Sequence, residues 1–196
     1  MATRTNSKSA PSPSNTSVEA IASLMADHKR VKALFKQFEE MREGSSDDEK
    51  TELVHQICDE LTIHTTIEEE IFYPAARKAI ENDDLLDEAL VEHAGAKDLI
   101  AQLQDMEAGD ELYDAKVTVL GEQIEHHVKE EEGEMFPMVR KSKVDTAALG
   151  REMDDRRTEL MAELALDSAD EGDDESESDD EVADSTAPRK SSAARR

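Results

Sequence analysis

One eleven-residue stretch occurs in two related copies, HTTIEEEIFYP at 64–74 and HVKEEEGEMFP at 127–137. Each copy begins with a histidine, has a glutamate four residues later (Glu68, Glu131) and ends with a proline ten residues after the histidine. Residues four apart on an α-helix lie about 40° from each other around the axis and about 6 Å apart along it. The repeat therefore predicts two helices that each present one imidazole and one carboxylate in the same direction.

Both copies lie within a pattern of four helices, because four segments carry apolar residues at three- and four-residue spacing. The first stripe comprises Ile21, Leu24, Met25, His28, Val31, Phe35 and Phe38, and the second Val54, Ile57, Cys58, Leu61, His64, Glu68, Ile71 and Phe72. The third comprises Leu86, Ala89, His93, Ala96, Lys97, Ile100 and Leu103, and the fourth Val117, Leu120, Ile124, His127, Glu131, Met135 and Met138. The short segments between the stripes predict an all-α fold, an up-down-up-down antiparallel four-helix bundle over residues 18–141.

The remaining segments are expected to lie outside this bundle. Residues 142–166 predict an additional helix, whose candidate packing residues are Leu149, Met153, Leu160, Met161 and Leu164. Residues 1–17 are rich in Ser, Thr, Pro and Asn, and residues 167–196 are acidic with almost no apolar side chains. Such segments cannot bury enough apolar surface to fold, so we expect both to be disordered. A protein partner for the acidic tail is not identified by its sequence.

The amino-acid composition disfavours several classes of partner and cellular location. With 23 basic and 49 acidic side chains the formal charge is 23 − 49 = −26, which disfavours nucleic acid and anionic membrane surfaces as partners. No run approaches the roughly 20 apolar residues that a membrane span needs, and the N-terminus lacks the apolar core of a signal peptide. Cys58 is the only cysteine, so no intramolecular disulfide forms, and we expect a reducing, cytoplasmic location.

A histidine interrupts the middle of every apolar stripe, at His28, His64, His93 and His127, and two stripes also carry a glutamate. Buried carboxylates are costly unless they are paired, so two inward glutamates among four histidines require a compensating cation. A pair of divalent metal ions supplies it, and imidazole suits iron, zinc, copper or nickel. The alternative is that each histidine is a satisfied core residue, but that explanation must hold separately on four helices.

Two other histidines serve as internal controls for this assignment. His55 lies nine residues before His64, about 180° away around the helix, so it should face solvent. His126 forms a second histidine–glutamate pair with Glu130, but the spacing to the proline matches His127 to His64 and excludes it. Glu132, five residues after His127, remains a fallback ligand.

These residues resemble the hemerythrin-like (HHE) family in order and spacing: His28, His64-x3-Glu68, Glu92-His93 and His127-x3-Glu131. The resemblance covers roughly Val18 to Lys141, and myohemerythrin is a known four-helix bundle. It implies two non-haem iron ions in a di-iron centre whose ferrous form meets dioxygen, with two carboxylates and an oxygen bridge joining the irons. Family members bind or sense oxygen, handle peroxide or nitric oxide, or buffer iron.

The chain departs from the oxygen-carrying hemerythrins at one position. Those proteins have a second histidine four residues after the third-helix histidine, where this chain has Lys97, which either points inward or extends to water. With His28 and His64 for one iron, His93 and His127 for the other, and Glu68 and Glu131 bridging, each iron keeps an open position. We expect Tyr73 and Phe136, at matching repeat positions, to be core residues, and Cys58 to be buried.

Three hypotheses for function follow. The first is a di-iron protein that binds dioxygen or a related small oxidant, acting in oxygen or redox sensing, peroxide or nitric oxide handling, or iron buffering. The second is a di-iron peroxidase- or oxidase-like enzyme that uses the open positions. The third is a metal-free helical interaction module. Metal content separates the third hypothesis from the first two.

Overall fold

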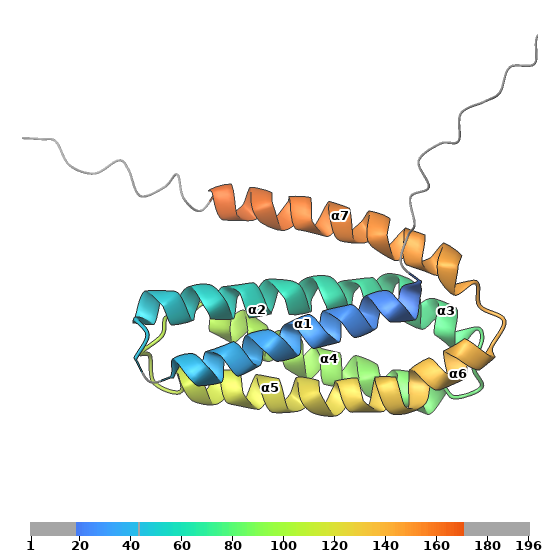
Figure 1. The fold of residues 1–196 in the computed structure, drawn as a ribbon, viewed down its shortest axis with the longest axis horizontal. Helices are drawn as coiled ribbons and strands as arrows, with labels where there is room; N and C mark the ends of the chain where they lie inside the picture. The colour runs from blue at the N-terminus through green and yellow to red at the C-terminus, as the bar shows by residue number, and fades with distance from the viewer. Residues whose placement is uncertain (1–18, 43, 171–196) are drawn as a thin grey trace, which may run out of the picture.

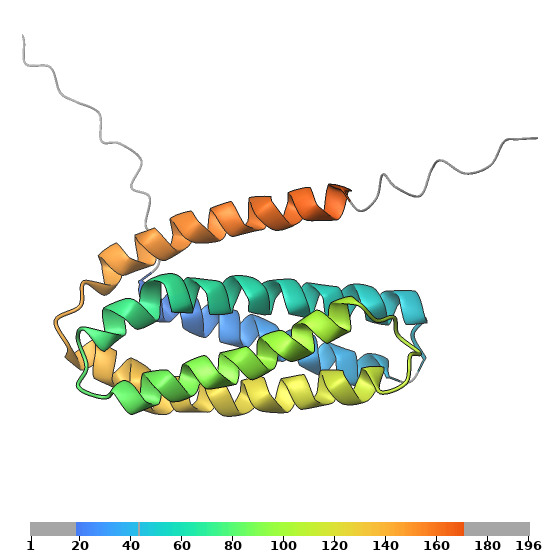
Figure 2. The ribbon, with the colours of Figure 1, turned by 180° about the vertical axis from the view of Figure 1, so that it is seen from behind.

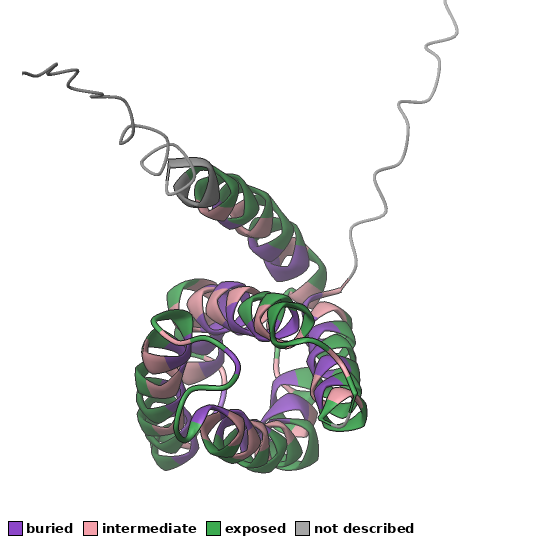
Figure 3. Cartoon of the chain, turned by 90° about the vertical axis from the view of Figure 1, so that its left-hand side faces the viewer, coloured by how far each residue is buried: buried purple, intermediate pink, exposed green. Residues whose placement is uncertain are grey.

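The computed structural model describes residues 19–42 and 44–170 and contains helices but no strand among them. Four long helices, α1 (Ala20–Met41), α2 (Asp47–Ile67), α4 (Asp83–Gln104) and α5 (Tyr113–Glu130), run antiparallel to their neighbours along the chain (Figure 1). Viewed along their axes they form a square with the buried residues facing its centre (Figure 3). The predicted all-α bundle is confirmed.

Each repeated stretch contains a π-helical turn that joins two α-helical segments into one longer helix. The turn η1 (Glu68–Phe72) joins α2 to α3 (Tyr73–Arg77), and η2 (Glu131–Met135) joins α5 to α6 (Phe136–Lys141). The prolines near the start of α3 and α6 lack an N–H and would clash with the carbonyl four residues earlier in a regular helix. The π turn widens the backbone just before each proline, so both longer helices continue without breaking.

Local capping explains where the helices begin. Ser46 accepts from the backbone N–H of Glu49, while the Glu49 carboxylate accepts from the N–H of Ser46, which is a complete capping box at the start of α2. At the start of α4 the Asn82 side chain accepts from the backbone N–H of Leu85, a single cap hydrogen bond. Gly109, in the loop before α5, has a φ of 103°, a conformation that side-chain-bearing residues rarely adopt.

The apolar core consists of two clusters separated by a polar layer. One cluster, at the end formed by α3 and α6, includes Leu24, Leu86 and Phe136. The other, toward the opposite end, includes Phe38, Ile57 and Leu120. In α1, in α4 and in the longer helix of α5 and η2 the site histidine lies between residues of the two clusters, and in α2 His64 follows Leu61 of one cluster and Ile63 of the other, so the polar layer has apolar packing on both sides.

The additional helix, α7 (Thr146–Asp170), lies against α1 and α2 on the outside of the square (Figures 1 and 2). Leu149, Met153 and Leu160 are buried as expected, but Met161 is 58% exposed, so its assignment as a packing residue was wrong. Met161 follows buried Leu160 and lies about 100° from it around the helix axis, so its side chain faces away from the bundle. The helix continues past residue 167, where the sequence places the start of the tail.

The other sequence-based expectations about the ends lie beyond the described residues: those for 1–17 and for 171–196 fall outside the structure. Within the described part of the chain, no helix combines the length and apolar character that crossing a membrane demands.

We predict that Leu120→Ala lowers the free energy of unfolding by about 2–5 kcal/mol, because it empties space in a close-packed cluster. Leu120 is fully buried, whereas Leu166, on α7, is 71% exposed. Leu166→Ala makes the same chemical change at an exposed position, where it leaves no cavity, and should alter the free energy of unfolding by less than about 0.5 kcal/mol. Chemical denaturation followed by circular dichroism measures both. Equal effects would contradict the assigned core.

Candidate metal centre

The structure brings the six predicted site residues together in the polar layer. His28, His64, His93 and His127 come from α1, α2, α4 and α5, and each is at most 6% exposed. Glu68 and Glu131, the first residues of the two π turns, are at most 1% exposed. Six ionisable side chains are therefore buried together in one layer of the bundle.

Each glutamate lies between two histidines from different helices. Glu68 Oε2 is 3.1 Å from His64 Nε2 and 3.4 Å from His93 Nε2. Glu131 Oε2 is 3.2 Å from His28 Nε2 and 3.5 Å from His127 Nε2. Each carboxylate thus reaches one histidine of the pair His28–His64 and one of the pair His93–His127, as a bridging ligand must.

Several of these central atoms lack hydrogen-bond partners in the described chain. His28 Nε2, His64 Nε2, Glu68 Oε1 and Glu131 Oε2 are buried and unsatisfied. Leaving such groups unpaired costs about 1–3 kcal/mol each, and more when they are charged. Ligand atoms from His28, His64, Glu68 and Glu131 lie within 4.8 Å of one another, as do those from Glu68, His93 and His127. Two cations sharing Glu68 fit this donor set, since nitrogen and carboxylate oxygen are both metal ligands.

The outward nitrogen of every site histidine meets a second carboxylate. The distances from Nδ1 are 2.9 Å for His28 to Glu132, 3.4 Å for His64 to Asp27, 3.0 Å for His93 to Glu69 and 2.8 Å for His127 to Glu92. An ionised carboxylate only accepts, so Nδ1–H donates and Nε2 is the nitrogen that faces the centre. This arrangement is typical of histidines that bind metals.

These outer carboxylates form a repeat that our sequence analysis did not use. Glu69 and Glu132 each follow a central glutamate, and Asp27 and Glu92 each precede a site histidine. Glu69 and Glu132 accept from the histidines of α4 and α1, respectively. Asp27 and Glu92 accept from the histidines of α2 and α5, respectively. The site is therefore pseudo-symmetric between α1–α2 and α4–α5. The fallback assignment of Glu132 as a ligand is not supported, because its oxygen contacts Nδ1 on the outer side of His28.

Tyr73 also contributes to the site, which corrects our expectation that it is only a core residue. Its hydroxyl donates to Glu131 Oε1 at 2.9 Å and lies 3.2 Å from His93 Nε2. In an α-helix Tyr73 would be about 140° around the axis from Glu68. The π turn instead hydrogen-bonds Tyr73 N–H to Glu68 C=O, which stacks the two residues on one face. Phe136, its counterpart, stacks on the ring of His28 with 5.7 Å between ring centres and no hydroxyl.

Lys97 does not point into the centre; it extends toward the surface, where it pairs with Glu69. Its ammonium donates to both oxygens of Glu69 at 2.7 Å, and its side chain is 43% exposed. Because Glu69 also accepts from His93, Lys97 acts on the site through two intervening residues. It is not positioned as a metal ligand.

The pKa values show how the cluster is balanced by protons when no metal is considered. Burial lowers the pKa of His64, but attraction to Glu68 and the hydrogen bond to Asp27 outweigh burial and raise it to about 10. Burial raises the pKa of Glu68, yet His64 and His93 hold it well below its usual range. Protons on imidazole thus compensate the buried carboxylates, and binding of metal cations would release them.

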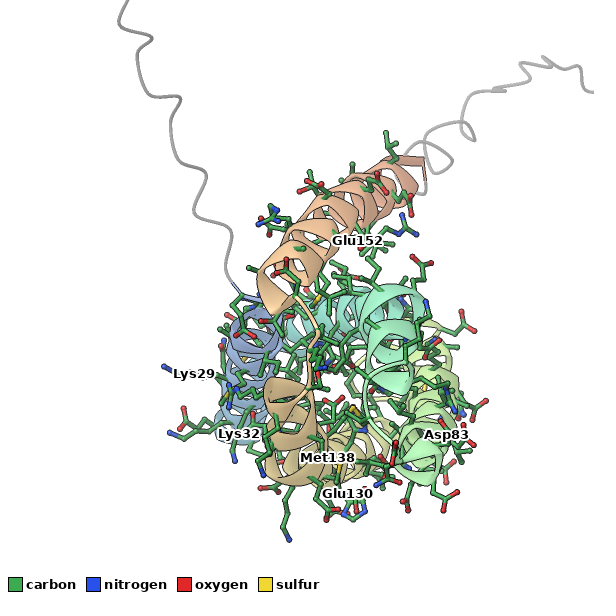
Figure 4. The ribbon with its side chains drawn as sticks, turned by 90° about the vertical axis from the view of Figure 1, so that its right-hand side faces the viewer. Lys29, Lys32, Asp83, Glu130, Met138 and Glu152 are labelled. Atoms are coloured by element: carbon green, nitrogen blue, oxygen red, sulfur yellow. The ribbon has the colours of Figure 1, made fainter. Side chains whose placement is uncertain are left out.

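A small cavity of about 10 Å³ lies beside the histidines and is walled by apolar side chains such as Val31, Leu61 and Ile124. Its volume suits one water molecule or a molecule of similar size. A groove of about 990 Å³ between α1 and α5 shares His28, Ile124 and Val128 with this cavity. Side chains fill the space between the helices in Figure 4, while Lys29 and Lys32 extend outward from α1 at the groove.

The control histidines lie where the sequence predicts. His55 is exposed, and His126 is 61% exposed beside Glu92 and Glu130 on the surface. Cys58 is fully buried, and burial raises the pKa of its thiol to about 12, which keeps it protonated.

We predict that Tyr73→Phe destabilises the metal-free protein by about 1–3 kcal/mol, because buried Glu131 loses its shortest hydrogen bond. Phenylalanine keeps the ring packing, as Phe136 does at the matching position. Equilibrium urea unfolding measures the change, and a circular dichroism spectrum checks that the helices are intact. Unchanged stability would mean that the hydroxyl does not donate to the carboxylate.

Comparison with known proteins agrees with this geometry. The sequence-family model of the hemerythrin HHE cation-binding domain matches residues 19–139 of this chain. A crystal structure of a hemerythrin HHE cation-binding domain-containing protein from Mycobacterium kansasii, a homologue of Rv2633c, superposes with a TM-score of 0.63. That alignment covers 76% of this chain and 91% of the other at 24% identity, so it supports the fold alone.

The match to one curated relative covers a smaller part of both proteins. A protein from Nostoc sp. described as a DNA nickase is 30% identical over 115 residues, which is 58% of this chain but 31% of the relative. The chain thus spans about a third of that protein's length. The family model covers more than half of the chain, including all six central residues. The chain belongs to the hemerythrin HHE cation-binding domain family.

Proposed function

We propose that this protein is a non-haem di-iron protein that binds dioxygen or a related small oxidant, such as peroxide or nitric oxide. Its physiological use would be oxygen or redox sensing, handling of peroxide or nitric oxide, or iron buffering. The single cysteine, buried as a thiol, favours a reducing compartment such as the cytoplasm.

One observation carries the proposal: two buried carboxylates each lie between imidazole nitrogens from two helix pairs. A single cation leaves one histidine pair without a partner, whereas two cations use all six central side chains. Imidazole nitrogen and carboxylate oxygen together suit iron. Iron would supply one-electron redox chemistry and positions at which a small oxidant binds.

The remaining side chains would control what reaches the metals. Val31, Leu61 and Ile124 exclude bulk water from the small cavity beside the histidines. The hydroxyl oxygen of Tyr73 lies 2.9 Å from Glu131 Oε1, to which it donates its proton, and it is close to the inward nitrogens of His93 and His127. The outer carboxylates keep each imidazole in one tautomer. The small cavity of about 10 Å³ admits a diatomic or similarly small molecule and is itself too small for an organic substrate.

A peroxidase- or oxidase-like enzyme is the second candidate, and Lys97 favours it. The oxygen-carrying hemerythrins have another histidine at this position, but the Lys97 ammonium binds Glu69 instead. One iron would therefore have one side-chain nitrogen fewer and more room for exchangeable ligands. Nicking of DNA, named for the Nostoc relative, is not part of the proposal, because the match covers 31% of that protein and this chain carries a charge of −26.

The direct test is anaerobic loading with ferrous iron followed by exposure to air. We expect about two irons per chain and new visible absorption on oxidation, because two ligand groups share a carboxylate. Steady-state consumption of peroxide with a reductant then separates the enzyme from a binding protein. A chain that takes up no iron would leave the metal-free interaction module as the remaining hypothesis.

Two adjacent histidines provide a matched pair of variants. His127→Ala should reduce iron loading to about one equivalent or less, because it removes one of only two inward nitrogens from the second ligand group. His126→Ala should load as the wild type does, because its side chain is 61% exposed. Iron content per folded chain, from elemental analysis, measures both. Equal loss in the two variants would contradict the assignment of faces.

A further inference from the structure

One of the four outer carboxylates is covered differently from the others. The Asp27 side chain is 4% exposed, whereas the side chains of Glu92, Glu69 and Glu132 are 22%, 27% and 38% exposed. Glu92 is the pseudo-symmetric counterpart of Asp27, and its second neighbour is the exposed ring of His126. Water can hydrate three of these carboxylates but hardly reaches Asp27.

Helix α7 covers Asp27. Arg157 of α7 donates through Nη2 to Asp27 Oδ2 at 2.5 Å, and the same oxygen lies 3.4 Å from His64 Nδ1. Arg30 occupies the other oxygen at 2.5 Å. Asp27 Oδ2 is therefore shared between a residue of α7 and a histidine of the metal centre. Arg157 is 15% exposed, so little solvent screens the contact.

Arg157 lies outside the part of the chain that the family model matches. The family match ends at residue 139, and α7 begins at Thr146. The pseudo-symmetric half of the site has no α7, and its Glu92 meets no arginine in the described structure. Asp27 is also held in its charged form, since its hydrogen bonds and attractions to His64 and Arg157 outweigh burial and lower its pKa.

We propose that α7 is an outer part of the metal centre, in which Arg157 is a positioning residue that holds His64 through Asp27. This inference rests on the proposed metal centre. Arg157 fixes Oδ2 where His64 Nδ1–H donates, so the inward nitrogen keeps its direction. Docking of α7 and binding of metal then stabilise each other, and the coupling must be equal in both directions.

Arg156 provides the control for Arg157. It is adjacent on α7 and also crosses to the bundle, where it donates to Glu70 at 2.7 Å, but Glu70 is 48% exposed and contacts no site histidine in the described structure. Loss of either arginine removes one ion pair between α7 and the bundle. Only loss of Arg157 leaves Asp27 Oδ2, the oxygen that faces His64, without its arginine.

The experiment measures ferrous iron affinity anaerobically against a chelator, together with hydrogen exchange in residues 146–170 with and without iron. In the wild type, iron should slow exchange in α7. Arg157→Gln should weaken iron binding roughly tenfold, the lower end expected for residues behind a metal ligand, and iron should no longer slow exchange. Arg157→Lys should restore part of both effects. Arg156→Gln should speed exchange but keep wild-type affinity and the full effect of iron.

Asp27→Asn tests the route through the carboxylate. It should weaken binding as Arg157→Gln does, and the double variant should be no weaker than the single ones, because both act through one contact. Melting of the metal-free variants checks that they fold. Equal iron affinity of Arg157→Gln and Arg156→Gln, with iron bound by the wild type, would overturn the role of α7. A wild-type chain without iron would instead overturn the metal centre, and this inference with it.

Discussion

Two ionised carboxylates, Glu68 and Glu131, lie in the middle of a bundle that is apolar on both sides of them. Burial of such charges is unfavourable unless opposite charge and hydrogen bonds compensate it. Four imidazoles, four outer carboxylates and a tyrosine hydroxyl are arranged around these two groups. The layer is stable only as a whole, because without opposite charge, from imidazole protons or from metal cations, the carboxylates would be uncompensated in a buried interior. Metal binding and folding are therefore linked in this protein.

The arrangement is nearly two-fold, and its departures from symmetry are informative. Glu69 and Glu132 serve equivalent histidines, but only Glu69 is also bound by a lysine, Lys97. Tyr73 places a hydroxyl between the central glutamates, whereas its counterpart Phe136 places a bare ring against His28. The two metal positions would thus differ in surroundings despite similar ligands. Such a difference suits a centre where a small molecule binds preferentially on one side.

The sequence was sufficient to predict the bundle and the six central residues, because both depend on helical periodicity and on charges in an apolar stripe. It was insufficient for Tyr73, because the prediction assumed regular α-helix and the π turn rotates that residue toward Glu68. The role of the four outer carboxylates as partners of the histidines was missed for a different reason: acidic residues are common on exposed faces of this chain. Their recurrence beside Glu68 and Glu131 was the available signal. Arg157 could not be found this way, since its partner is 130 residues away.

Anomalous X-ray scattering from crystals grown with ferrous iron tests the central claim most directly. We predict two iron positions in the layer, one bounded by His28 and His64, the other by His93 and His127. Glu68 and Glu131 should lie between the two irons. The absence of iron from this layer, or a single site on the surface beside His126 and Glu130, would contradict the account.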